Sequence, residues 1–412
     1  MSALNKMIRK AVNLTPGIKE TAIWLYDRCA GMRYRKYVRT CPANPHKVLF
    51  ESYLGRKYSC SPRAMFEAMC QDPRYDGYEK IWAFTDPEKH RYLEKQYPNT
   101  RVIAYRSEEY YRCYAEAGYW ITNYTLGPGI KKRPEQIYVQ TWHGTPLKKI
   151  GCDVPRLGVS RAERKRTLKK YQTEGTQINY MPSPSPFYTE TVRKAFRLKE
   201  QGEMLELGYP RNDALFTAKE DDIARIRKEL NLPEDKKVIL YAPTWREKNH
   251  VAGEGYTCEL GIDFDQLKEA LSDQAVILFR THYFISSAFD FSKYDGFLRD
   301  VSNYDEINDL YLVSDLLITD YSSVFFDYAN LERPILFYMY DYEDYKEEMQ
   351  DFYFDVSMLP GPMITVQQDI SGDILELLHN FNVDEKYQRF NETFNPYRRA
   401  CSGEVLRKIF PD

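Results

Sequence analysis

Short apolar runs recur along this chain with longer polar stretches between them, and this rhythm limits its possible folds more than any other feature. Short strands that alternate with helical connections are typical of a mostly parallel, doubly wound sheet. The rhythm begins again in the second half, so we predict two such α/β units. The runs lie at 47–52, 80–85, 101–105, 119–123 and 137–142, and then at 237–246, 275–283, 296–302, 315–323 and 333–341.

The expected domain boundaries follow from the positions of these runs. A chain of 412 residues is long enough for two or three domains. A Pro- and Gly-containing stretch at 208–215 is our predicted interdomain linker. We therefore predict a basic segment at 1–40, an N-terminal α/β domain at 41–210, a C-terminal α/β domain at 211–385 and a helical tail at 386–412.

Residues 1–40 combine apolar side chains at helical spacing with many Lys and Arg residues and few acids. Two interpretations stay open: a basic amphipathic helix pair at a membrane surface, or a helix that packs on its own domain. A second basic run, SRAERKRTLKKY at 160–171, is typical of a solvated helix face and would also suit anionic lipid or a polyphosphate. No apolar run approaches the roughly 20 residues that span a bilayer.

Composition and missing motifs exclude several classes of function. A net charge of −2 gives no overall attraction to nucleic acid. The 8 cysteines contain no CxxC pair and are interpreted as free thiols of a reducing cytosol. The sequence has no Walker loop and no GxGxxG after a strand, so we expect no cofactor. Its histidines do not have the spacing of a zinc site, so we expect no metal. The DFD at 263–265 is interpreted as helix-entry chemistry rather than a metal-holding DxD.

The stretch YVQTWHGTPLKKIG, residues 138–151, places a histidine where a strand ends. Gly144 and Pro146 break any regular element, so His143 is expected in a loop at the edge of the sheet. In an open α/β sheet the carboxyl edge is where ligands bind. A buried structural histidine is the alternative for a single residue of this kind.

Strand ends in the second half carry polar residues of a similar kind. Arg246 and Arg280 lie in the terminal parts of two of the runs and suit a diphosphate by charge and geometry. Ser322 and Ser323 end a third run and begin a predicted helix, which suits a phosphate. Each residue has a structural alternative, an N-cap for Ser322 or a carboxylate partner for Arg280. Together they predict a site for a phosphate-rich ligand.

Several motifs occur in a fixed order: TWHGTPLKKIG, GYPRND, YAPTWRE, RTHY and ITDYSSVFFDYANLERPILFY. In that order they resemble the CDP-glycerol glycerophosphotransferase family, the teichoic acid primases and polymerases of bacterial envelopes. The resemblance covers roughly residues 45–360. It implies a GT-B fold, with two Rossmann-like domains that face each other across a cleft. It also implies a peripheral (monotopic) protein on the cytoplasmic face of the cell membrane.

The resemblance assigns the donor site to the C-terminal domain. His282, expected with His143 to be catalytic, matches a histidine that contacts the diphosphate, and Arg280 lies in the same motif. Asp327 matches an acidic position that reaches the sugar or glycerol hydroxyls of the donor. The remaining donor positions are Thr244 and Arg246 on the nucleotide side, and the phosphate-binding hydroxyls of Ser322 and Ser323.

The resemblance assigns the base and the acceptor to the N-terminal domain. His143 matches the proposed catalytic base, which would activate an acceptor hydroxyl for attack on CDP-glycerol with release of CMP. Gly144, Thr145 and Lys148 are the expected acceptor-binding residues. Ordinary solvated lysine is the alternative for Lys148 and Lys149. The acceptor is expected to be a lipid-linked saccharide or a polymer.

Other functions stay open at this point. A CDP-ribitol transferase, or a GT-B glycosyltransferase that uses a nucleotide-sugar, would share this fold. A non-catalytic scaffold for envelope assembly is a third possibility, although the two motif histidines argue against it. The length of the chain favours a primase, a short polymerase or a capsule enzyme over a long processive polymerase.

Overall fold

The structure, a computed structural model, describes residues 16–155, 161–244, 250–251, 255–256, 261–281, 289–348 and 351–410. The chain divides into two compact units. The first contains Met1–Trp142, Thr176–Met181 and Glu200–Glu203, and the second contains His143–Gly175, Pro182–Lys199 and Met204–Asp412. His143 is thus grouped with the second unit, whereas the division into acceptor and donor domains stays a prediction.

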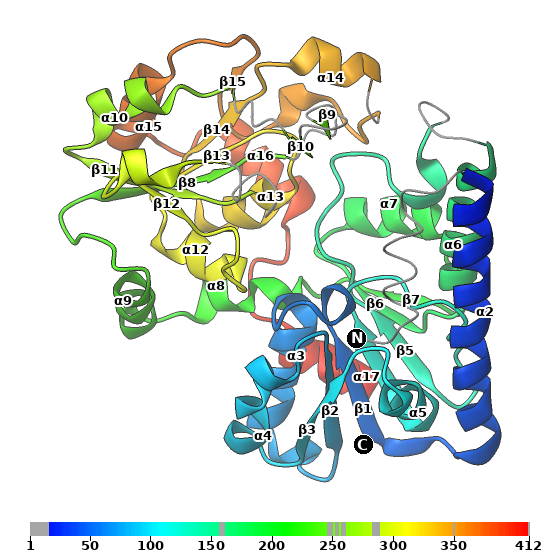
Figure 1. Ribbon diagram of the computed structural model, residues 1–412. Helices are drawn as coiled ribbons and strands as arrows, with labels where there is room; N and C mark the ends of the chain where they lie inside the picture. Colours follow the sequence, from blue (N-terminus) through cyan, green and yellow to red (C-terminus); the bar gives the residue numbers. More distant parts are fainter. Residues whose placement is uncertain are drawn as a thin grey trace. The chain divides into compact units, whose positions relative to one another are not determined.

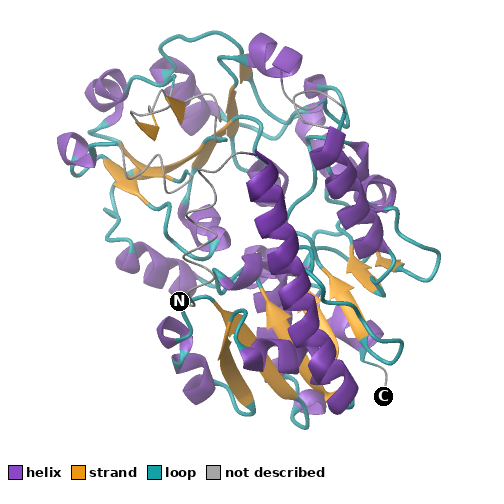
Figure 2. Ribbon diagram, turned by 45° about the vertical axis from the view of Figure 1, so that its right-hand side comes forward, coloured by secondary structure: helices purple, strands orange, loops and turns teal. Residues whose placement is uncertain are grey.

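The first unit is built on a seven-stranded sheet in the order β3-β2-β1-β4-β5-β6-β7. The chain moves outward from β1 through β2 to β3 and then resumes at β4 on the other side of β1, which is a doubly wound order. Figures 1 and 2 show helices on both sides of this sheet. The strands are β1 (Asn44–Glu51), β2 (Glu79–Phe84), β3 (Thr100–Ala104), β4 (Ala117–Thr122), β5 (Ile137–Gln140), β6 (Tyr180–Pro182) and β7 (Glu203–Leu205).

The second unit repeats this arrangement with a six-stranded parallel sheet in the order β12-β11-β8-β13-β14-β15. Alternate residues of β8 enter different cores. Val238 and Leu240 pack with α12, α13 and α16, while Ile239 and Tyr241 pack with α10 and α15. The strands are β8 (Lys237–Ala242), β11 (Ala275–Phe279), β12 (Leu298–Asp300), β13 (Leu316–Thr319), β14 (Ile335–Tyr338) and β15 (Met363–Ile364). A separate antiparallel pair is formed by β9 (His250–Val251) and β10 (Gly255–Tyr256).

Helices connect the strands in both units. In the first unit they are α2 (Pro16–Thr40), α3 (Cys60–Gln71), α4 (Tyr92–Gln96) and α5 (Glu108–Glu116). The second unit contains α6 (Arg161–Gly175), α7 (Pro186–Phe196), α8 (Asp213–Thr217), α9 (Glu220–Glu229), α10 (Phe264–Leu271), α12 (Ile307–Val313), α13 (Val324–Tyr328), α14 (Tyr342–Glu348), α15 (Ser371–Asn380), α16 (Glu385–Phe394) and α17 (Ser402–Ile409). None of the described helices is both long and apolar enough to cross a bilayer.

Each predicted apolar run overlaps a strand, whereas the predicted linker is largely buried. Residues 210–212 form a 3-10 turn that continues directly into α8, and Arg211 and Asn212 are buried. The segment is therefore a packed part of the second unit. In the DFD stretch, Asp263 accepts hydrogen bonds from the backbone N–H groups of Asp265 and Gln266 and caps α10, as helix-entry chemistry requires.

Helix α2 packs against α5 in the first unit. Ala30 and Tyr34 are buried, and the Tyr34 hydroxyl donates to the carbonyl of Lys131 at 2.6 Å. Gly129, at a φ of +76°, lies so close to α2 that an added Cβ would be 2.4 Å from the Gly31 Cα atom. Of the two interpretations of the basic segment, packing on its own unit is therefore confirmed for this inner face of α2. Residues 1–15 lie outside the described part of the chain.

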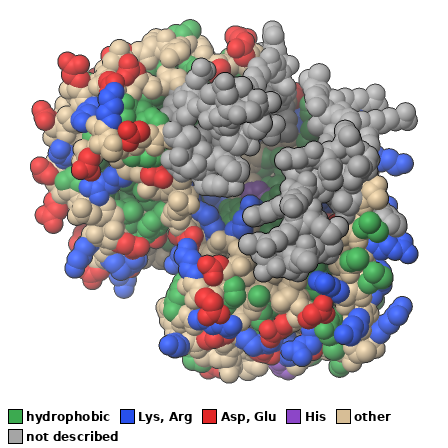
Figure 3. Space-filling view, in the orientation of Figure 1, with side chains coloured by type: hydrophobic (Ala, Val, Ile, Leu, Met, Phe, Trp, Pro, Cys, Tyr) green, Lys and Arg blue, Asp and Glu red, His purple; other side chains and the backbone are tan. Residues whose placement is uncertain are grey.

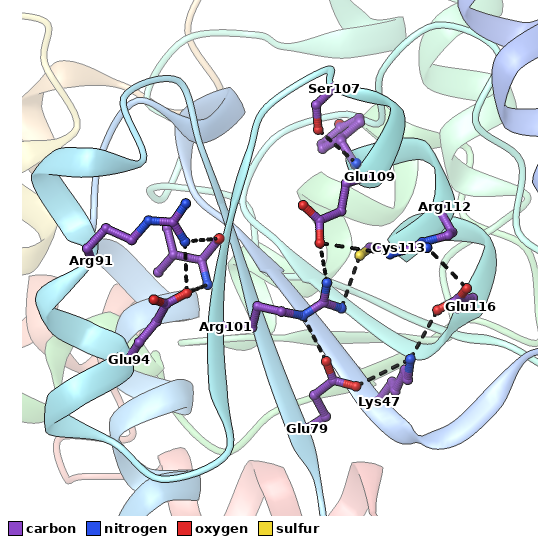
Figure 4. Close-up of polar contacts among 12 residues, drawn as sticks. Lys47, Glu79, Arg91, Glu94, Arg101, Ser107, Glu109, Arg112, Cys113 and Glu116 are labelled. Atoms are coloured by element: carbon purple, nitrogen blue, oxygen red, sulfur yellow. Dashed lines mark hydrogen bonds and ion pairs between the residues drawn. The ribbon is translucent and has the colours of Figure 1, made fainter.

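A charged network ties the amino ends of three strands in the first unit to α5 (Figure 4). Lys47 in the first half of β1 pairs with Glu79 at 3.3 Å and with Glu116 at 3.0 Å. Arg101 at the start of β3 pairs with Glu79 at 2.9 Å and also with Glu109. These side chains are 20–41 % exposed, so the network fixes the position of α5 without a fully buried charge.

A single carboxylate is buried at the opposite end of β1. Glu51 is 2 % exposed and accepts hydrogen bonds from the hydroxyls of Tyr110 at 2.9 Å and Tyr114 at 3.0 Å. Burial raises the pKa of the Glu51 carboxyl from 4.5 to about 7, although both hydrogen bonds and the charge of Arg106 act against this rise. At neutral pH and above, the folded protein therefore contains a buried charge that the unfolded chain exposes to water.

The Glu51 environment predicts how stability depends on pH. Between pH 4.5 and 7 the folded state binds the additional proton, so the free energy of unfolding falls as pH rises through this range. Glu51→Gln keeps an acceptor for both tyrosines and removes the charge. We expect this variant to be more stable than wild type by about 3 kcal/mol at pH 8, with the difference vanishing near pH 4. Urea unfolding at several pH values measures both quantities. Glu88→Gln, at a side chain 79 % exposed, is the matched control and should show no such trend; a trend of equal size there would contradict the assignment.

Candidate functional site

Polar residues that follow the strands of the second sheet lie along its carboxyl edge. The strand order changes direction between β8 and β13, and ligands of open α/β sheets bind outside the carboxyl ends at such a point. Thr244 follows β8, Ser322 and Ser323 follow β13, and Arg280 directly follows β11. The structure thus brings four of the predicted donor-site residues to one edge. Arg246 and His282 lie outside the described residues.

Asp320 joins the ends of the two central strands. It is buried, and its carboxylate oxygens accept from the backbone N–H of Thr244 at 2.8 and 3.0 Å. Next to it, the Thr319 hydroxyl donates to the carbonyl of Ala242 at 2.8 Å. These bonds fix where the chain leaves β8 and β13. Asp320 belongs to the TDYSS motif, but the motif alone gave no indication that its carboxylate binds the backbone after β8.

The loop that contains His143 lies against the start of α13. Gly144 has a φ of +155°, and a Cβ atom at this position would lie 2.7 Å from the Ser323 Oγ atom. Ser323 occupies the N-cap position of α13, but its side chain makes no capping hydrogen bond within the described residues. The residue after Gly144, Thr145, is buried. The HGTP and TDYSS motifs, far apart in the sequence, therefore meet within the second unit.

The lysines after this loop have partners in the second unit. Lys148 forms an antiparallel bridge with Phe352, and its Nζ atom donates to the Tyr345 hydroxyl at 3.1 Å. Lys149 pairs with Asp351 at 2.5 Å. Both lysines are half-buried. A role of Lys148 in acceptor binding stays a prediction.

The Tyr345 ring connects Lys148 to the TDYSS motif. Tyr345 stacks on the buried Tyr321 with ring centroids 3.6 Å apart and planes inclined by 5°. The Tyr321 hydroxyl donates to Asp341 at 3.1 Å. The segment after the HGTP loop and the segment after β13 therefore both contact the same pair of stacked tyrosine rings.

Asp327 is buried within α13. Its side chain is 3 % exposed and pairs with Arg211, whose Nη2 atom is 2.6 Å from Oδ2. The amide of Asn212 donates to Oδ1 at 2.9 Å. Both carboxylate oxygens therefore have protein partners, and contact with the donor stays a prediction for this residue. Arg211 and Asn212 belong to the GYPRND motif, for which the sequence analysis predicted a linker and no site residue.

The Arg280 side chain also binds backbone carbonyls. Its Nη1 atom donates to the carbonyls of Val301 at 3.1 Å and Tyr304 at 2.8 Å, which holds the loop after β12. A half-buried guanidinium in this position can still present part of its edge to a ligand. Its assignment to the donor site stays a prediction.

Comparisons with known proteins show similarities in sequence and in fold. Residues 33–411 match the profile of a family described as CDP-Glycerol:Poly(glycerophosphate) glycerophosphotransferase. The teichoic acid poly(glycerol phosphate) polymerase of Staphylococcus epidermidis is 40% identical over 361 residues, which cover 87% of this chain and 48% of the relative. The protein with the same description from Bacillus spizizenii is 36% identical over 370 residues, which cover 89% of this chain and 92% of the relative. The chain thus spans about half the length of the first relative and most of the second.

Among solved structures, a variant of the wall teichoic acid polymerase TagF soaked with CDPG is similar to this chain, with a TM-score of 0.82 and 35% sequence identity. The alignment covers 92% of both chains. Together with the two doubly wound sheets, this similarity confirms the prediction of a GT-B fold with two Rossmann-like units. Since the profile matches nearly the whole chain, the protein belongs to the CDP-glycerol:poly(glycerophosphate) glycerophosphotransferase family.

Proposed function

We propose that this protein transfers glycerol phosphate from CDP-glycerol to a hydroxyl of an acceptor and releases CMP, in teichoic acid or capsule-type polymer synthesis. One observation carries the proposal: the His143–Gly144 loop lies against Ser323 at the edge where the second sheet would hold a nucleotide. A potential base and potential phosphate-binding hydroxyls are therefore neighbours in a chain of this family. The relatives described as glycerol phosphate polymerases favour glycerol over ribitol in the donor.

The reaction requires a base, a place for the diphosphate and a leaving group. The acceptor oxygen bonds to the phosphorus that carries glycerol, and the bond from this phosphorus to the bridging oxygen breaks. CMP leaves with the electron pair of that bond. His143 takes the proton of the attacking hydroxyl, since an imidazole titrates close to neutral pH. The histidine His282 and the arginines Arg246 and Arg280 would stabilise the charge on the phosphate oxygens.

The two substrates would use neighbouring groups of the second unit. Ser322, Ser323 and Thr244 would donate to the donor's phosphates and nucleotide. Gly144 and Thr145 would let the acceptor approach His143 closely, and Lys148 would provide a positive charge for the acceptor. We propose a lipid-linked saccharide or polymer as acceptor, because a phosphodiester chain needs a hydroxyl terminus that remains at the enzyme.

The outer face of α2 supports peripheral binding to the cytoplasmic face of the cell membrane. Leu25 and Met32 are 50% and 51% exposed, and Arg28, Arg35 and Lys36 are exposed on the same helix. Basic and apolar side chains lie along the right-hand edge of the space-filling view, where α2 runs in the same orientation (Figures 1 and 3). Exposed apolar side chains among cations are typical of helices that lie on anionic lipid.

The product formed from each donor tests the proposed function. We expect CMP and a new phosphodiester from CDP-glycerol with a lipid-linked glycerol phosphate acceptor, and far slower turnover of CDP-ribitol. Separation of nucleotides by chromatography identifies CMP, and mass spectrometry identifies the extended acceptor. Release of a nucleoside diphosphate from a nucleotide-sugar, with none from CDP-glycerol, would instead establish a glycosyltransferase.

The role of His143 predicts a separation of binding from catalysis. His143→Ala and His143→Gln should bind CDP-glycerol nearly as well as wild type and lose at least ~10²-fold in kcat, since a general base contributes about 10²–10⁴-fold. Any wild-type rise in rate with pH through a group near 6–7 should be absent in both variants. Calorimetry and a pH–rate series measure these effects. His379→Gln, at an exposed histidine of α15, is the control. Weaker donor binding together with a lower Tm and an unchanged pH profile would indicate a structural histidine.

The proposed membrane face predicts charge-dependent binding to lipid. Replacing Arg28, Arg35 and Lys36 with Gln should weaken binding to phosphatidylglycerol vesicles by more than ~10²-fold, because each surface cation contributes about 1 kcal/mol. High salt should release the wild-type protein. The same three-charge change at the exposed Lys219, Arg225 and Lys228 is the control. Equal vesicle binding by both triple variants would exclude α2 as the membrane face.

A further inference from the structure

The GYPRND motif contributes a buried arginine to the core beneath the His143 loop. The Arg211 side chain is 6% exposed, and its partner Asp327 is 3% exposed. A buried guanidinium is retained in a protein interior only when its charge and its N–H groups are satisfied. The Asp327 carboxylate supplies the opposite charge at 2.6 Å, and the Asn212 amide satisfies the second oxygen of this carboxylate at 2.9 Å.

The other arm of the guanidinium reaches the peptide group after His143. The Nη1 atom of Arg211 donates a hydrogen bond to the His143 carbonyl oxygen. The N–H of Gly144, which belongs to the same peptide group, donates to the Tyr209 hydroxyl at 2.9 Å. The peptide that joins His143 to Gly144 is therefore held at both of its polar ends by side chains two residues apart in one motif.

The holding residues are themselves fixed. The Arg211 carbonyl accepts a hydrogen bond from the Asn308 side chain, and the Asn212 N–H donates to the Tyr209 carbonyl at 2.8 Å. On the opposite side of the loop, Ser323 leaves no room for a Cβ atom at Gly144. The plane of the 143–144 peptide consequently has little freedom to rotate. That plane contains the Cα and C atoms of His143 and so fixes the axis about which its Cβ atom can turn, which limits where the imidazole can reach.

We propose that Arg211 is a positioning residue for His143, and that Asp327 and Tyr209 complete a clamp on the peptide between His143 and Gly144. The inference rests on the proposed function in assigning His143 the base. Arginine is required because its planar fork can contact the carboxylate and the carbonyl at the same time, whereas a lysine ammonium is a single point of charge. In this arrangement Asp327 acts through Arg211 rather than on the donor.

The test compares two Arg→Lys variants that keep the net charge. Arg211→Lys removes the fork that reaches the His143 carbonyl. Arg333→Lys is the matched control, since the Nη1 atom of Arg333 also donates to carbonyl groups, those of Tyr311, Leu312 and Ser314 at 2.7–3.1 Å, at the end of α12. Steady-state kinetics with CDP-glycerol, the pH–rate profile and Tm are measured for both variants.

We expect Arg211→Lys to lower kcat by about 10²-fold, the cost of a misplaced catalytic group, while KM for CDP-glycerol changes by less than about threefold. The pH of half-maximal rate should also move, because the imidazole would meet a different environment. Arg333→Lys should lower Tm without either change. Equal kcat in the two variants, or losses in kcat that only follow the folded fraction, would overturn the proposal.

Imidazole NMR provides a readout that does not need turnover. The His143 resonance is assigned by its loss in His143→Gln, and Arg211→Lys should shift both its position and its titration midpoint, whereas Arg333→Lys should leave them unchanged. An unshifted His143 resonance in folded Arg211→Lys would overturn the clamp. Failure of wild type to release CMP from CDP-glycerol would refute the proposed function alone, since the resonance still decides whether Arg211 positions His143.

A second, milder variant keeps the proposal testable if Arg211→Lys does not fold. Tyr209→Phe removes only the hydroxyl that accepts from the Gly144 N–H. Tyr387→Phe is its control, because this buried tyrosine donates its hydroxyl to the Arg333 carbonyl at 2.8 Å. A fall in kcat of about tenfold in Tyr209→Phe alone supports the clamp, and equal kcat in the two variants overturns it.

Discussion

The burial of parallel strands on both faces is the constraint on which this structure depends. Val48, Leu49 and Phe50 of β1 are each 0% exposed, and so are Ile239 and Leu240 of β8. A strand enclosed in this way has no place for an unpaired polar side chain along its length. Polar chemistry is therefore displaced to the strand ends, where the chain turns toward solvent and backbone groups need partners. The concentration of motifs at strand ends is a direct result of this packing.

The two kinds of strand end are used differently. At the amino ends of β1, β2 and β3, Lys47, Glu79 and Arg101 pair with one another and with α5, which fixes a helix on the sheet. At the carboxyl ends of β8 and β13, Asp320 bonds to backbone N–H groups and leaves the hydroxyls of Ser322 and Ser323 half-buried at the edge. Charge pairs thus stabilise the amino ends of strands in the first sheet, and polar groups suited to a ligand collect at the carboxyl ends of strands in the second sheet.

Sequence reasoning identified the elements with strong local signals. Continuous apolar runs gave the long strands, whereas β7 and β15, with 3 and 2 residues, have too few positions to show a pattern. The motif order indicated the edge residues, including His143 and Ser323. The Arg211–Asp327 pair could not be found in this way, because more than a hundred residues separate its two members and neither motif indicates the other as its partner. Likewise, Gly208–Asp213 has the composition of a linker, and only packing reveals that Arg211 and Asn212 are buried.

The peptide group between His143 and Gly144 has a consequence for how such proteins can diverge. Its carbonyl and its N–H are bound by Arg211 and Tyr209, and Gly144 fits only beside a small side chain at position 323. Three segments, around 143, 210 and 323, therefore depend on one another structurally, although genetic recombination can separate them. A chimaera that inherits the HGTP loop from one relative and the GYPRND segment from another would keep every motif residue and still join segments that had not adapted to each other. A hybrid between members of this family would then keep the geometry of the carboxyl edge of the second sheet only if these three segments are compatible, even when every motif is present.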